Sequence, residues 1–187
     1  MPKVYSVKKC RKSPGQCGKC GTKIEKGKPY VFWAFMVGGK GGPNHIRCGQ
    51  AACYPKPSDL TQSEFWSGVY SLQETGFSGD TIEDLESSRD GVVSELQSIK
   101  DELENRLGNM PDGLQQGSTG ELLQERIDAL DSVISELESA DISFDEPEKE
   151  EEESDEEFEN RKTEELESRC EEIRTELEGI LEGISCS

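Results

Sequence analysis

The sequence holds a single histidine, His45, and few aromatic residues. Catalytic triads and Cys–His pairs both need an imidazole, so every such scheme would depend on this one residue. Carboxylates are abundant, but they recur at helical spacing, where paired acidic side chains arise by chance. The sequence therefore favours a protein that is not an enzyme.

Long apolar runs are also missing. No stretch is long enough to cross a membrane, and residues 1–5 lack the apolar character of a secretory signal peptide. The seven cysteines are odd in number, which fits a reducing compartment where thiols bind metal and do not form disulfides. We therefore expect a cytoplasmic protein with no membrane partner.

Basic residues become scarce beyond residue 60. Residues 1–60 contain 12 Lys and Arg against 2 acidic residues, which leaves a net charge of +10. Residues 61–187 contain 9 Lys and Arg against 38 acidic residues, which leaves −29. This asymmetry predicts DNA or RNA as a partner of residues 1–60, and a different kind of partner for the remainder.

Two close cysteine pairs are the main motif that is present. Cys17 and Cys20 form a Cys-x-x-Cys turn, and Cys48 and Cys53 follow 27 residues later. Such pairs predict one tetrahedral Zn²⁺ with four thiolate ligands, a closed site that leaves no position for a catalytic water. Metal binding would supply much of the folding free energy, because a module of about 60 residues buries little core.

The ligand set has an alternative. His45 and Cys48 make a His-x-x-Cys pair, which would replace Cys53 as the fourth ligand. That arrangement resembles the zinc fingers of poly(ADP-ribose) polymerases, which combine Cys-x-x-Cys with a distant His-x-x-Cys. We favour the four-cysteine set because thiolates are the commonest ligands of closed structural sites. Cys10 is a further candidate, more typical of a plain thiol.

Short strands are expected around the cysteines. Residues 29–37 are rich in aromatic and β-branched side chains and predict one strand, which turns at a glycine-rich segment. Residues 44–47 would return to deliver Cys48 to the metal, and residues 5–9 would add an edge strand. The aromatic residues of the long strand, Tyr30, Trp33 and Phe35, either stack on bases or pack in a core, and we favour core packing.

A helix closes this module. The capping box at residues 61–64 predicts a helix to about residue 74, with Phe65, Val69 and Leu72 on one face. Residues 1–75 are thus predicted to form a small zinc-bound, β-rich module of the zinc-ribbon or treble-clef kind.

Residues 80–187 predict an α-helical, coiled-coil-like acidic tail. Apolar residues step by three and four over residues 82–103, 123–137 and 166–184. Residues 80–140 would form a helical hairpin or coiled coil, and residues 141–187 an acidic linker followed by a helix from about residue 148. Repulsion between carboxylates slightly favours a dimer of separated helices over a bundle within one chain.

Several segments together resemble a group of small tailed-bacteriophage proteins that have a zinc-ribbon-like module and an acidic helical tail. The matching segments are residues 4–12, 17–21, 24–27, 30–35 and 53–63. The group has no assigned activity. The resemblance implies a phage-encoded protein of the bacterial cytoplasm, and it favours Cys48 and Cys53 as the second ligand pair.

These observations predict a zinc-binding accessory protein. Its basic module would bind nucleic acid, or the machinery on it, through residues 1–60. The alternatives are an adaptor that binds a protein partner or itself through residues 80–187, and an acidic mimic of DNA that inhibits a host enzyme.

Overall fold

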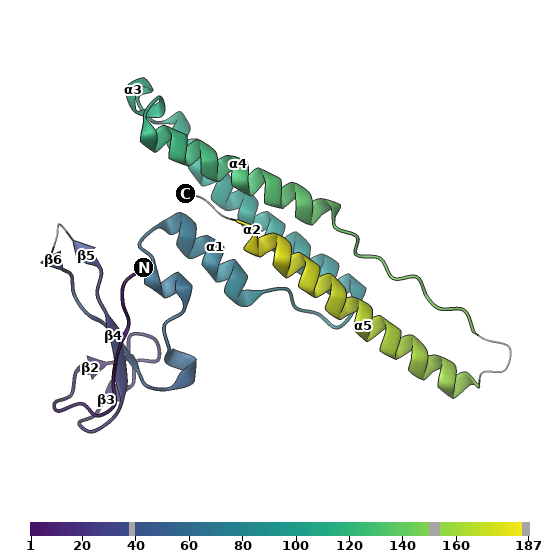
Figure 1. Cartoon of the computed structure of the whole chain (residues 1–187), viewed down its shortest axis with the longest axis horizontal. Helices are drawn as coiled ribbons and strands as arrows, with labels where there is room; N and C mark the ends of the chain where they lie inside the picture. Colours follow the sequence, from purple (N-terminus) through teal and green to yellow (C-terminus); the bar gives the residue numbers. More distant parts are fainter. Residues whose placement is uncertain (38–39, 150–153, 185–187) are drawn as a thin grey trace. The chain divides into compact units, whose positions relative to one another are not determined.

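The computed structural model describes residues 1–37, 40–149 and 154–184, and the chain divides into two compact units (Figure 1). The first unit, residues 1–74, contains every described strand and a cluster of four cysteines. The second unit, residues 75–187, is helical. The predicted combination of a small β region and a helical C-terminal part is therefore present.

The first unit is built on a three-stranded antiparallel sheet. Its strand order is β1 (Tyr5–Val7), β4 (Tyr30–Trp33) and β7 (His45–Cys48). Tyr5 lies opposite Phe32, and Tyr30 lies opposite Cys48. The expected edge strand and return strand are both confirmed.

The long strand expected over residues 29–37 is interrupted. After β4 the chain leaves the sheet at Ala34 and Phe35, and it re-enters a two-stranded hairpin of β5 (Met36–Val37) and β6 (Lys40–Gly41). Pro43 has no N–H to continue the ladder of β7, and Gly42 N donates instead to the Phe35 carbonyl over 2.7 Å. The tip of this hairpin, residues 38–39, lies outside the described residues.

Two further elements lead to the helix of the first unit. The 3₁₀ turns η1 (Ala51–Cys53) and η2 (Pro57–Leu60) precede α1 (Glu64–Thr75). Ser63, not Thr61, caps α1, since Trp66 N donates to Ser63 Oγ over 3.4 Å while Thr61 Oγ1 accepts from Ser63 N. Phe65 and Val69 are buried as predicted.

The second unit contains α2 (Ile82–Gly108), the short α3 (Asp112–Gln115), α4 (Ser118–Ser139) and α5 (Asp155–Glu182). The helices α2 and α4 lie side by side as an antiparallel hairpin, and α5 packs against both (Figure 1). No helix among the described residues has the length and apolar character that a membrane crossing requires.

The three apolar stripes bury one another within a single chain. In each long helix, the apolar residues spaced by three and four positions are buried against the other helices, as predicted. The pairing expected between two chains is therefore not needed to cover these stripes. The buried residues are Leu85, Val92, Leu96, Leu103, Ile127, Leu130, Val133, Ile134, Leu137, Cys170, Ile173, Leu177, Leu181 and Ile184.

The described part of the segment before α5, residues 141–149, is not helical. A capping box at Ser154 and Glu157 starts α5 at Asp155, later than the expected start near residue 148. Cations of α5 hold the described part of the segment, residues 141–149. Arg169 donates to the carbonyls of Ser143 and Asp141, over 3.1 and 3.2 Å. These contacts tie the segment that follows α4 to α5.

Candidate metal centre

Four cysteines of the first unit meet at one point. The sulfur atoms of Cys17, Cys20, Cys48 and Cys53 all lie within 4.8 Å of one another, and none of the cysteines in the described part of the chain forms a disulfide. The Sγ atoms of Cys20 and Cys48 are 3.8 Å apart. Four thiol groups at this separation match the donor set of a tetrahedral metal site.

The first pair is presented by a tight turn after β2 (Gly15–Gln16), which pairs with β3 (Lys23–Ile24). Gly21 N donates to the Cys17 carbonyl and Cys17 N donates to the Thr22 carbonyl, both over 2.9 Å. Gly21 has φ +69°, a left-handed conformation that glycine adopts without strain. The backbone bonds of this turn therefore hold the thiols of Cys17 and Cys20 close to each other.

The second pair comes from the end of β7 and from η1. Cys48 is the last residue of the strand, and Cys53 follows after a turn in which Cys53 N donates to the Gln50 carbonyl over 3.0 Å. Gly18 N donates to the Ile46 carbonyl over 2.8 Å, which ties the first turn to β7. The two arms of the cluster are thus held by backbone bonds.

His45 is not part of the cluster. Residues alternate between the two faces of a strand, so His45 and Cys48 point to opposite sides of β7. The imidazole instead stacks on Trp33, with ring centroids 5.3 Å apart and an interplanar angle of 15°. The structure therefore brings together the four cysteines and leaves His45 outside their cluster.

The other cysteines stand apart from this site. Cys10 is buried next to the cluster, and its thiol donates to the Glu25 carbonyl over 3.0 Å. Cys170 lies in the core of the helical unit as a small apolar residue. Cys186 lies outside the described residues. Cys10 is thus a plain thiol, as expected.

The thiols of the cluster differ in acidity. Burial raises the pKa of Cys17, but hydrogen bonds from the backbone of Cys20, Cys48 and Lys19 outweigh burial and lower it to about 6. A hydrogen bond with the Cys48 side chain, together with burial, raises the pKa of Cys53 to about 12. Four thiolates this close repel one another, and a bound cation removes that repulsion.

Arg47 supports the site from the other face of β7, a role that the sequence analysis missed. Its guanidinium pairs with Asp59 of η2 over 2.7 Å and lies over the Trp33 ring, 5.4 Å from the centroid. A Cβ atom at Gly18 would lie 2.6 Å from Arg47 Nη1, so a larger residue in the cysteine turn would displace the guanidinium. The sequence feature that could have indicated this role is the position of Arg47 directly before Cys48 in the expected return strand.

Comparison of the chain with protein-family models, with curated proteins and with solved structures found no match. The resemblance to small bacteriophage proteins therefore stays a prediction. The case for a function rests on the cluster itself and on the surface around it.

Proposed function

We propose that the four-cysteine cluster holds one Zn²⁺ as a closed structural site. The donor set supports this assignment, because soft thiolates in a tetrahedral arrangement select zinc or iron, and a site of four thiolates leaves no position for a substrate. Cys17 and Cys53 are buried, which fits a role in folding. Zinc and iron are distinguished by elemental analysis and by visible absorbance, since a zinc–thiolate site is colourless.

We also propose that the first unit binds nucleic acid through its phosphate backbone. The observation that carries this proposal is the exposure of its cations. Of the 12 Lys and Arg in residues 1–60, Arg47 pairs with Asp59 and Lys56 with Glu74. The other ten side chains are all exposed: Lys3, Lys8, Lys9, Arg11, Lys12, Lys19, Lys23, Lys26, Lys28 and Lys40.

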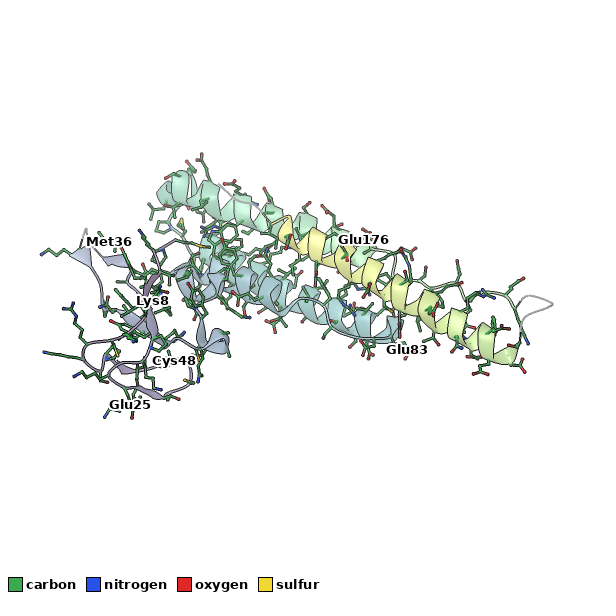
Figure 2. All side chains as sticks on the ribbon, turned by 60° about the horizontal axis from the view of Figure 1, so that its bottom comes forward. Lys8, Glu25, Met36, Cys48, Glu83 and Glu176 are labelled. Carbon is green, nitrogen blue, oxygen red and sulfur yellow. The ribbon has the colours of Figure 1, made fainter. Side chains whose placement is uncertain are left out.

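The distribution of these cations favours binding with little sequence preference. They lie on strands, turns and loops of the first unit, in which Lys8 and Cys48 are labelled in Figure 2. Helix α1 carries no Lys or Arg, so it lacks the charge that holds a recognition helix in a DNA groove. Phosphate contacts alone give affinity that depends on salt and not on base sequence.

The test is a binding titration with the zinc-loaded full chain. Fluorescence anisotropy with a labelled oligonucleotide at low salt should detect binding. A variant with Lys8, Lys9, Arg11 and Lys12 all changed to Gln should bind at least tenfold more weakly with unchanged zinc content. Equal binding by this variant, or none by the unchanged chain, contradicts the proposal.

A protein partner is a second candidate, for the helical unit. Carboxylate oxygens follow the helices in Figure 2, where Glu83 of α2 and Glu176 of α5 are labelled. Leu114 is the one large apolar side chain that the described part of this unit exposes. A partner would therefore meet an acidic surface, which favours a basic protein. The apolar stripes of α2, α4 and α5 are buried within one chain and are not left for self-association. Light scattering tests the last point: one chain has a mass of 20.8 kDa, and a value twice as large would show a dimer.

A further inference from the structure

An aromatic groove of about 800 Å³ opens on the first unit, outside the metal centre. Five aromatic rings line it, from three separate stretches of the sequence. The aromatic groove also includes Lys3, Met36 and several small or polar side chains. The five rings are those of Tyr5, Phe32, Phe35, Trp66 and Tyr70.

The rings of this groove are arranged in stacks. Tyr5 and Phe32 are partners across β1 and β4, with centroids 5.3 Å apart and an interplanar angle of 19°. Trp66 and Tyr70, one turn apart on α1, stack with centroids 5.4 Å apart. Tyr5 is 48% exposed, whereas the core ring of Trp33 is 1% exposed. The groove thus presents flat aromatic surface that the fold itself does not cover.

A basic hollow of about 590 Å³ continues from the aromatic series. Tyr30 stacks on Phe32 with centroids 5.9 Å apart, and Tyr30 lines this second hollow. The cations of the hollow are Lys9, Arg11 and Lys12. The series Tyr5, Phe32 and Tyr30 therefore connects the aromatic groove with the basic hollow across the surface of β1 and β4.

Charge and shape together identify the occupant. Neither hollow has a carboxylate among its lining residues, and Lys3 lies over the Tyr5 ring, 5.5 Å from its centroid. A ligand that suits both hollows carries negative charge at regular spacing together with flat apolar groups. Unpaired bases on a phosphate backbone have both properties, whereas a duplex keeps its bases stacked inside. An acidic peptide supplies only the charge.

We propose that the aromatic groove and the basic hollow bind a single-stranded segment of nucleic acid, an inference that rests on the proposed nucleic-acid function. Bases stack on the half-exposed Tyr5 ring, where they displace Lys3, and on the Trp66–Tyr70 pair. Phosphates of the same strand meet Lys3 at the groove and Lys9, Arg11 and Lys12 at the hollow. The first unit therefore prefers single strands to duplex because only single strands offer bases to these rings.

The test compares two tyrosines in the zinc-loaded full chain. Tyr5→Leu keeps an apolar side chain in the groove but removes the flat ring. Tyr54→Leu is the matched control, because Tyr54 is 51% exposed in the same unit and lines neither hollow. Fluorescence anisotropy at low salt measures the affinity of each protein for a 12-nucleotide oligothymidylate and for a 12-base-pair duplex. Zinc content and circular dichroism verify that both variants are folded.

The unchanged chain should bind the single strand more tightly than the duplex, and only Tyr5→Leu should lose this preference. Tyr5→Leu should weaken oligothymidylate binding about fivefold or more, as expected for the loss of one stacked base, and should leave duplex binding unchanged. Tyr54→Leu should change neither affinity. If both oligonucleotides bind and Tyr5→Leu changes neither affinity, this inference is overturned while the proposed function stands.

Two other outcomes also decide the matter. If neither oligonucleotide binds, the proposed function is wrong and this inference falls with it. An oligoglutamate of equal charge is the competitor that separates a peptide site from a nucleic-acid site. If it displaces labelled oligothymidylate as effectively as the unlabelled strand does, the groove recognises charge alone and the inference is overturned.

Discussion

The sulfur atoms of Cys20 and Cys48 lie 3.8 Å apart, although 27 residues lie between them in the chain. Two thiolates on one tetrahedral Zn²⁺ stand about 3.8 Å apart, given Zn–S bonds of about 2.3 Å. A backbone hydrogen bond from Gly18 N to the Ile46 carbonyl joins the first cysteine turn to β7 and holds this spacing. The cluster joins the turn after β2 to the end of β7, so the metal site and the β fold of the first unit depend on each other.

Loss of one ligand should therefore unfold the first unit. Cys53→Ser removes a buried ligand, and we expect it to abolish zinc binding and to expose Trp33. Cys10→Ser is the matched control, because Cys10 is 5% exposed and Cys53 4%, yet Cys10 is not in the cluster. Elemental analysis and tryptophan fluorescence check the result. Retained zinc in Cys53→Ser, with zinc lost in His45→Ala, would show that the ligand set is wrong.

Removal of the metal should affect the two units differently. A strong chelator should unfold the first unit, since metal binding is coupled to its folding, and should leave the helical unit intact. We expect Trp33 emission to shift to longer wavelength while most of the helical circular dichroism remains. If the helical signal fell in parallel with the fluorescence change, the helical unit would depend on the metal as well.

Replacement of Arg47 should destabilise the first unit without removing a ligand. Arg47→Leu leaves Asp59 without its ion pair and removes the guanidinium from the Trp33 ring. The Arg47 side chain is only 14% exposed, so we expect a loss of about 1–3 kcal/mol in the free energy of unfolding. Lys8→Leu, on the surface, should cost less than about 0.5 kcal/mol. Urea denaturation followed by tryptophan fluorescence measures both values, and equal losses would argue against a supporting role for Arg47.

The helical unit depends on its internal seam. Leu96 is fully buried between the helices, so Leu96→Ala should lower the free energy of unfolding by about 2–5 kcal/mol. Leu114→Ala is the control, because Leu114 is exposed in the short α3 and its loss leaves no cavity. Urea denaturation followed by circular dichroism measures the difference. Equal, small effects at both positions would mean that the seam is not a packed core.

Local patterns in the sequence predicted the parts of this structure that depend on neighbouring residues. The cysteine turn follows from two thiols and a glycine within five residues, and the helical seams follow from apolar steps of three and four. The cap of α2 is also local: Thr81 Oγ1 accepts from Asp84 N over 3.2 Å.

The features that were missed depend on partners far away in the chain. Where the chain leaves the sheet between β4 and β5, the Phe35 carbonyl accepts from Gly42 N. The segment before α5 is bound by Arg169, which lies 26 and 28 positions beyond its partners Ser143 and Asp141. The aromatic groove combines Tyr5 with Trp66, which no sequence pattern relates. Burial of Trp33 was expected, whereas the exposed series from Tyr5 was not.

The central claim is that the basic, metal-centred unit binds nucleic acid. Anisotropy of the zinc-loaded full chain with oligothymidylate, compared at 50 and 200 mM salt, tests it most directly. If four phosphates are contacted, affinity should fall about 50-fold over that range. Absence of binding at 50 mM salt, or an affinity that does not change with salt, would contradict the account.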